Sequence, residues 1–319
     1  MTRPLTTLDS RSIGLLDEAL RFGAPLDLRL EGPLPAPLEA PEVAPLFRSA
    51  RSTDPSTDAA LQRWSAPAAR WAPGPAVTAV LPASRGRPIG IGALRGQDVP
   101  VRVLVLANGR HGPQRVDGAE VRVVPWRGHG TTRQAAVAEV ETPYVLFTVD
   151  DAVVLGAGCI RRMIETLEST GADAVVARQV PWPSADRVTR ERLRAWTPAR
   201  PGPRDVSQVD HVCALYRTRT LRDSPLPDVP IAEDLAWSRS RRVVLAPDAP
   251  VLHSHARRVR ALWARERATH AQRRRLGMSS TVPSLGGALV QALGAVRHGP
   301  REVPRHLAEL LGQWWGGRA

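Results

Sequence analysis

Short apolar runs alternate with helical stretches over the middle of the chain. Five runs have the length and composition of buried strands: 77–81, 101–106, 121–124, 144–149 and 174–177. Stretches with a helical pattern separate them, at 89–97, 131–140 and 158–170. Strands that alternate with helices indicate βαβ units, so we expect an α/β fold whose mostly parallel sheet is flanked by helices. Ligands of such sheets bind at the carboxyl ends of the strands.

The pattern changes towards both ends of the chain. The first 75 residues hold 11 of the 30 prolines, which interrupt helices and remove hydrogen-bond donors from strands. We therefore expect an irregular N-terminal extension over 1–75, with one short helix near 13–22, followed by an α/β domain over 76–256. A helical region is expected over 257–319. Its three predicted helices are 258–276, 285–296 and 301–314.

The last part of the α/β domain has a weaker pattern. Residues 181–206 are rich in Pro and Arg, which suggests a loop or short helices over a site. A strand is predicted at 211–216 and a short helix at 232–240. Two short strands are predicted at 243–245 and 250–252.

Composition narrows the function classes. The 319 residues include 44 basic and 31 acidic ones, for a net charge of +13, and every basic residue is Arg. Without Lys there is no Walker-type phosphate lysine and no Schiff-base lysine, although Arg binds phosphate well. Two cysteines exclude a disulfide scaffold. The N-terminal residues lack a signal-peptide pattern and no apolar stretch reaches 18 residues, so we expect a cytoplasmic protein.

The acidic pair Asp150-Asp151 is the strongest candidate for chemistry. It directly follows the predicted buried strand 144–149. Neighbouring carboxylates repel each other, and a divalent cation such as Mg²⁺ or Mn²⁺ would relieve this repulsion. The alternative is that an Asp caps a helix, but Val153, Val154 and Leu155 intervene before the next helical pattern.

Two further groups carry candidate chemistry. Glu233-Asp234 opens a predicted helix, where an acidic pair is also favoured by the helix dipole alone. His253 and His255 follow a predicted strand, and residues two apart on a strand share a face. Each imidazole could be a metal ligand or a structural side chain.

Three weaker signals lie after the first strands. Residues 128–134 form a Gly-rich start of a helix with Arg133, which is a favourable surface for phosphate. The turn Pro82-Ala-Ser-Arg85 follows the first strand, and Asn108 ends the second.

Taken in order, these segments resemble a family-2 glycosyltransferase of the GT-A type, and its rhamnosyltransferase-like branch most closely. The resemblance covers roughly residues 76–315 and is most specific in two segments, Ile231-Ala-Glu-Asp-Leu-Ala-Trp237 and Ala246-Pro-Asp-Ala-Pro-Val-Leu-His-Ser-His255. It implies a Rossmann-like, mostly parallel sheet flanked by helices, with a helical C-terminal region. The chain departs from the family pattern at three positions: Asn108, Gln134 and Ala152.

The resemblance also implies roles for the candidate residues. Asp151, Asp150 and His253 would hold Mg²⁺ or Mn²⁺, and Asp234 would be the general base, with Glu233 as the runner-up. The remaining donor-binding residues would be Pro82, Ser84, Arg85, Asn108 and Arg133, with Asp150 also reaching the ribose. The reaction would be an inverting transfer of a sugar from a nucleoside diphosphate donor to an acceptor hydroxyl. The expected donor is dTDP-rhamnose, and UDP-sugars are the second choice.

Partners and rival classes follow from the same residues. The acceptor would be a glycan, a lipid-linked molecule or a small metabolite, and no nucleic acid is expected. The Arg-rich helix and the Trp-bearing last helix could contact the inner face of an anionic membrane, or be core packing with a solvated Arg face. The rival functions are an Arg-rich binder of nucleic acid or membrane, a nucleotidyltransferase on a similar core, and an inactive glycosyltransferase relative.

Overall fold

The structure is a computed structural model, and it describes most of the chain after residue 76. The described residues are 27–30, 49–65, 77–84, 88–109, 111–198, 200–229, 231–254, 259–278, 284–294, 296 and 302–316. The helix expected at 13–22, the side chain of Arg85 and that of His255 lie outside these residues.

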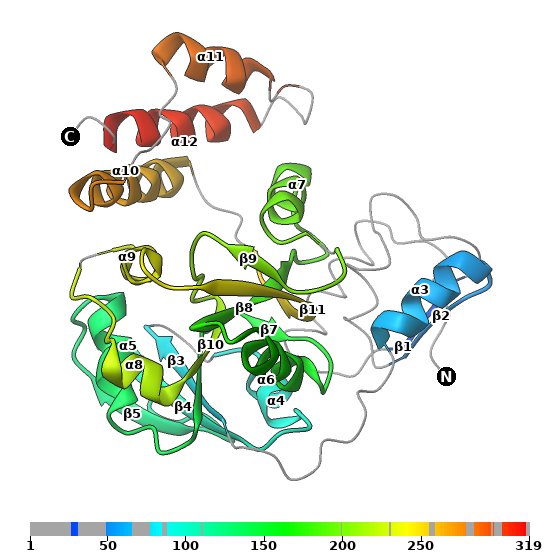
Figure 1. Ribbon diagram of the computed structural model, residues 1–319. Helices are drawn as coiled ribbons and strands as arrows, with labels where there is room; N and C mark the ends of the chain where they lie inside the picture. The colour runs from blue at the N-terminus through cyan, green and yellow to red at the C-terminus, as the bar shows by residue number, and fades with distance from the viewer. Residues whose placement is uncertain are drawn as a thin grey trace.

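One large sheet organises the described part of the chain (Figure 1). Its strands are ordered β5-β4-β3-β6-β10-β8-β11-β7, and β9 pairs with β11. Their bounds are β3 Val77–Ala83, β4 Val101–Asn108, β5 Glu120–Val124, β6 Tyr144–Thr148, β7 Val153–Val154, β8 Ala174–Val180, β9 Arg204–Val206, β10 Cys213–Arg217 and β11 Val243–Leu252.

Six of these strands run in one direction. β3, β4, β5 and β6 pair in parallel, as do β8 and β11. β10 is antiparallel to both β6 and β8, so β8 and β11 have the same direction as β6. The expected mostly parallel sheet is therefore confirmed. Because these strands run in the same direction, the carboxyl ends of β3, β4, β6, β8 and β11 lie at the same edge of the sheet.

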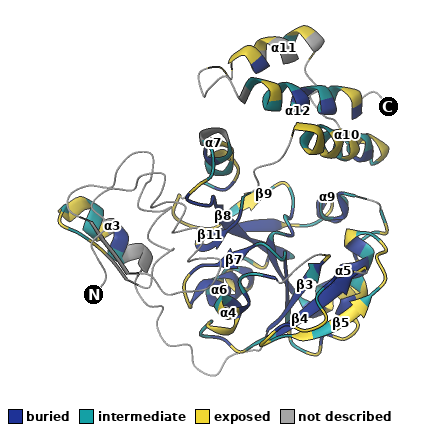
Figure 2. Ribbon diagram, turned by 180° about the vertical axis from the view of Figure 1, so that it is seen from behind, coloured by how far each residue is buried: buried dark blue, intermediate teal, exposed yellow. Residues whose placement is uncertain are grey.

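Helices cover both faces of the sheet (Figure 2). Val77, Ala79 and Leu81 of β3 point to the face covered by α4 (Ile91–Arg95) and α6 (Cys159–Thr170). Val80, between them in the strand, points to the other face, where α5 (His129–Val137), α8 (Thr218–Asp223) and α9 (Glu233–Ser238) pack. Both faces are apolar because the strands are buried on both sides, which explains the continuous apolar runs in the sequence.

β11 is a single strand where two short ones were expected. Its register against β8 shifts between Ala246 and Pro250. Pro247 and Pro250 have no N–H to donate, so the intervening residues form an irregularity instead of a regular ladder. The strand nevertheless resumes pairing through Leu252, and this pairing places the following residue, His253, at the edge of the sheet.

Four further helices lie above the sheet in Figure 1. They are α7 (Arg187–Trp196), α10 (Val259–Arg275), α11 (Leu285–Gly294) and α12 (Glu302–Gly316). α12 packs closely on α10, because a Cβ on Gly312 would lie only 2.6 Å from the Trp263 carbonyl oxygen. The expected helical C-terminal region is confirmed. No helix of the described residues combines the length and apolarity that a bilayer crossing requires.

The N-terminal segment contains more regular structure than its prolines predicted. β1 (Asp27–Leu30) pairs in parallel with β2 (Ser49–Ser52), and α3 spans Pro55–Ser65. The only proline of α3 is its first residue, where the missing N–H would have no partner in the helix. A proline-free run after Pro55 is therefore free to form a helix.

Candidate functional site

Several predicted site residues meet at the edge where the parallel strands end. Asn108 is the last residue of β4, Ser84 directly follows β3, and Asp150 follows β6. The backbone N–H of Ser84 hydrogen-bonds to the Asp150 carboxyl, so the structure brings these two residues together. Pro82 lies within β3, opposite Leu106 of β4. Asn108 is buried, and its Oδ1 has no hydrogen-bond partner among the described residues.

Asp150 and Asp151 are an electrostatically strained pair. Burial raises the pKa of Asp150 to about 6, and the charge of Asp151 adds to this. Burial also raises the pKa of Asp151. Both shifts disfavour the charged carboxylates, and a nearby cation would reverse them.

His253 is the third predicted metal residue and lies beside Asp151. Its Nε2 is 3.6 Å from Asp151 Oδ1, although the two residues are about one hundred positions apart in the chain. No group of three or more His, Cys, Asp or Glu side chains in the described part of the chain is arranged to hold a metal ion. A carboxylate and an imidazole nonetheless fit a cation whose other ligands are water and substrate phosphate oxygens, as is common for Mg²⁺.

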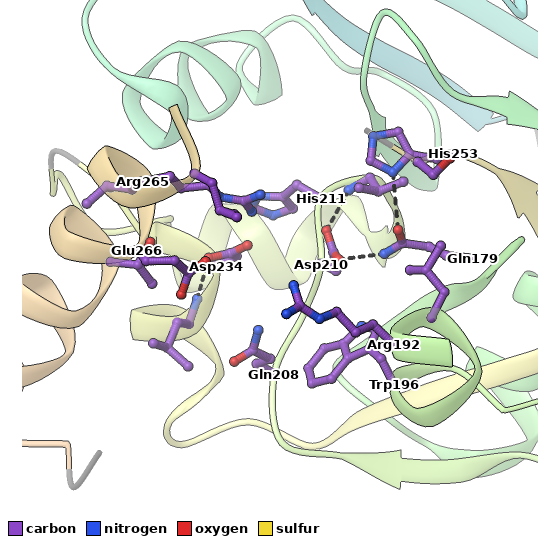
Figure 3. Close-up of a pocket in the computed structure, with 18 of the residues that line it drawn as sticks. Gln179, Arg192, Trp196, Gln208, Asp210, His211, Asp234, His253, Arg265 and Glu266 are labelled. Atoms are coloured by element: carbon purple, nitrogen blue, oxygen red, sulfur yellow. Dashed lines mark hydrogen bonds between the residues drawn. The ribbon is translucent and has the colours of Figure 1, made fainter. Parts of the chain in front are cut away.

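A cavity of about 870 Å³ lies between this edge and the helices α7, α10 and α12. Its lining includes His253, Arg133, Glu233 and Asp234, four of the predicted site residues. Figure 3 shows Asp234 and His253 on the walls of this cavity, with His211 and Asp210 between them. Asp151 is connected to these cavity residues by its proximity to the His253 imidazole.

Asp234 is positioned by the first turn of α9. The preceding N-cap residue, Ala232, has a φ of 62°, and no other non-glycine residue of the described chain has a positive φ. Such a conformation costs free energy and is often found at functional sites. The carboxyl Oδ1 of Asp234 accepts a hydrogen bond of 2.7 Å from the backbone N–H of Leu235.

The pKa of Asp234 is raised to about 6. Burial is the largest cause, the charge of His211 opposes it, and the charges of Glu233 and Asp210 add to it. At neutral pH the group is therefore ionised but takes up a proton readily. This is the property that a general base needs near pH 7.

Glu233 has the opposite environment from its neighbour. Its Oε1 accepts hydrogen bonds from Arg133 Nη1 at 3.0 Å and is 3.3 Å from His211 Nδ1, and all three side chains are buried. Burial alone would raise its pKa, but the hydrogen bond and charge of His211 and the charge of Arg133 lower it to about 2. A Cβ on Gly130 would lie 2.8 Å from the Glu233 side chain, so the Gly-rich start of α5 makes room for this ion pair.

Sequence reasoning missed the groups that support these residues. His211 Nε2 is 2.8 Å from the Tyr216 hydroxyl, and Gln179 lies between Asp210 and His253. None of these residues belongs to a recognisable motif. Their only signal in the sequence is polarity within or beside apolar strand segments.

Comparisons with known proteins give similar folds only. No family model matches the chain, and no curated protein matches it. A mannosyltransferase from Pyrobaculum calidifontis, solved with GDP-Man and Mn²⁺, is 15% identical, with 96% of this chain and 83% of that chain covered and a TM-score of 0.44. TarS of S. aureus, solved with UDP-GlcNAc, is 14% identical, with 74% and 71% covered and a TM-score of 0.38. Likenesses this low identify neither the family nor the activity of this chain.

Proposed function

We propose that this chain is a metal-dependent inverting glycosyltransferase with a nucleoside diphosphate sugar as donor. One observation carries the proposal. Asp234, whose pKa is about 6, lines the same cavity as His253, and His253 faces Asp151. A base near neutrality and a carboxylate–imidazole pair that could hold a cation, beside one cavity, are the two elements that a metal-dependent inverting transfer from a sugar diphosphate would use.

The donor side of the proposed site is the edge at β3, β4 and β6. Asp151 and His253 would hold Mg²⁺ or Mn²⁺, which would supply positive charge against the leaving diphosphate. Asp150, fixed by the Ser84 N–H, would contact the metal or the ribose. Pro82, Arg85 and Asn108 would surround the base and ribose.

The acceptor side is the cavity itself. An acceptor hydroxyl loses its proton to the Asp234 carboxylate while its oxygen forms a bond to the anomeric carbon. The bond from that carbon to the diphosphate oxygen breaks, and the nucleoside diphosphate leaves with the electron pair. Attack from the face opposite the leaving group inverts the configuration at the anomeric carbon.

Glu233 and Arg133 have supporting roles in this proposal. Glu233, with a pKa of about 2 and two buried partners, is a poor base compared with Asp234. Arg133 would hold Glu233 and so fix the start of α9. The ion pair uses only Nη1 of Arg133, and Arg133 lines the cavity, so its other N–H groups could contact a donor phosphate while the pair stays intact.

A donor screen with metal tests the function. Labelled dTDP-, UDP- and GDP-sugars would be incubated with the protein and Mn²⁺, and binding of each nucleoside diphosphate would be measured by calorimetry. Sugar transfer or release of free sugar supports the proposal, with dTDP-rhamnose and UDP-sugars as the expected donors. Pyrophosphate release would indicate a nucleotidyltransferase, and salt-dependent DNA binding without sugar release would indicate an Arg-rich binder.

A further inference from the structure

Gln179 forms part of the cavity wall between His253 and Asp210 (Figure 3). Gln179 belongs to β8, and Val251 of the parallel neighbour β11 lies opposite it. His253 is two residues beyond Val251, and its backbone N–H donates to the Val180 carbonyl at 2.9 Å. Gln179 and His253 therefore project from the same side of the sheet as diagonal neighbours. Both residues are buried, with 7% and 6% of their surface exposed.

The hydrogen bonds of Gln179 fix the direction of its side-chain amide. Its Nε2 lies 2.6 Å from Asp210 Oδ2, and the other oxygen of Asp210 accepts from the backbone N–H of Val212 at 3.0 Å. A carboxylate can only accept, so the NH₂ group of Gln179 must face Asp210. The carbonyl oxygen of Gln179 must then face His253.

This direction determines where the proton of His253 lies. Gln179 Oε1 is 3.2 Å from His253 Nδ1, and a carbonyl oxygen can only accept, so Nδ1 carries a proton. A neutral imidazole has one ring proton, so Nε2 then bears a lone pair in place of a proton. Nε2 is the atom that lies 3.6 Å from Asp151 Oδ1.

We propose that Gln179 and Asp210 are positioning residues that hold His253 in its Nδ1–H tautomer and direct its Nε2 lone pair at a divalent cation beside Asp151. The part that concerns the cation rests on the proposed function. Metal-binding histidines generally donate their second N–H to an oxygen acceptor, and loss of that acceptor weakens metal binding. Here the acceptor is an amide, and Asp210 prevents that amide from turning over.

Nitrogen NMR of labelled histidines tests the tautomer directly, without metal. Spectra would be recorded at pH 8, where a histidine of ordinary pKa is neutral, and the signal of His253 assigned by its loss in His253→Asn. The wild type should show a protonated Nδ1 and a bare Nε2. Gln179→Leu should abolish this preference. So should Asp210→Asn, because an Asn side chain can donate as well as accept and therefore leaves Gln179 free to turn.

A matched control separates positioning from general stability. Gln97 also makes two side-chain donations of 3.0 Å, to the carbonyls of Ala93 and Gly156, and lies outside the cavity lining. Gln97→Leu should lower stability but leave the His253 nitrogen signals unchanged. If Gln179→Leu does not fold, the isosteric Asp210→Asn carries the test alone.

Mn²⁺ provides the second readout, because it broadens the signals of nuclei close to it. Mn²⁺ alone should broaden the NMR signals of His253. The substitutions Gln179→Leu and Asp210→Asn should each weaken Mn²⁺ binding about 10- to 100-fold. A wild-type Nε2–H tautomer, absence of broadening at His253, or unchanged tautomer and affinity in both variants would overturn the inference. Mn²⁺ binding with the expected tautomer but no nucleoside diphosphate binding would instead refute the proposed function and leave the inference standing.

Discussion

Replacement of Asp234 by Asn should make the protein more stable and less active at once. Asn has nearly the same shape as Asp but cannot ionise or take a proton. The rise in the Asp234 pKa from 3.8 to about 6 means that the folded state binds its proton more tightly than the unfolded state. Stability is therefore lost as the pH rises from about 4 through about 6, and the ionised side chain costs up to about 3 kcal/mol above that range.

The assay is urea unfolding of wild type and Asp234→Asn at several pH values. At about pH 3, below the ordinary pKa of 3.8, the two proteins should differ little through this carboxyl, since it is then mostly protonated in both the folded and the unfolded state. At pH 7.5 the variant should be more stable by up to about 3 kcal/mol. Sugar transfer, or donor hydrolysis, should fall by roughly 10² to 10⁴ because the base is gone, while donor and Mn²⁺ binding persist.

Asp150→Asn is a matched comparison, because the pKa of Asp150 is also raised to about 6. It should show a similar pH-dependent gain in stability but should weaken the binding of nucleoside diphosphate with Mn²⁺. The reasoning about Asp234 is refuted if Asp234→Asn turns over donor at the wild-type rate. It is also refuted if the variant gains no stability at pH 7.5.

Three further predictions concern neighbouring residues. Glu233→Gln should destabilise the protein by about 3–5 kcal/mol in urea unfolding, because the buried charge of Arg133 loses its partner; an unchanged midpoint would contradict this. Asp151→Asn should abolish the dependence of nucleoside diphosphate binding on Mn²⁺ in calorimetry, and full wild-type activity in excess EDTA would argue against any metal role. Gly130→Ala should cost about 1–3 kcal/mol, because the new Cβ would lie 2.8 Å from Glu233, and a variant as stable as wild type would show that α5 can shift.

Most of the sheet could be predicted from the sequence because its strands are buried on both faces. Short apolar runs such as 144–149 and 174–177, which contain β-branched Val, favour a buried strand over a helix. The order and direction of the strands in the sheet could not be predicted from the sequence. β10 lies antiparallel between β6 and β8, and an apolar run contains no information on its direction.

In the candidate site, too, the local features could be predicted from the sequence, whereas the long-range contacts could not. Asp150 and Asp151 were found because they directly follow a strand, and strand ends meet at one edge. The ion pair of Arg133 with Glu233 joins residues one hundred positions apart. Single-sequence patterns report neighbours within an element, so they could not show that Arg133 is already engaged or that Gln179 faces His253.

The environments of Glu233 and Asp234 could not be predicted either. The two residues are adjacent and chemically alike, yet their pKa values are about 2 and about 6. The difference arises from burial and from the hydrogen bonds that His211 and Arg133 direct at Glu233 alone. The direction in which each side chain points at the start of α9 determines which carboxyl receives these hydrogen bonds. That direction depends on tertiary packing.

The most direct test of the account is the release of sugar from labelled nucleoside diphosphate donors by three proteins: wild type, Asp151→Asn and Asp234→Asn. The account predicts Mn²⁺-dependent release by the wild type, loss of the Mn²⁺-dependent part of donor binding in Asp151→Asn, and retained binding without turnover in Asp234→Asn. A wild-type protein that binds no nucleoside diphosphate in the presence of Mn²⁺, or that releases sugar equally fast when Asp234 is Asn, would contradict it.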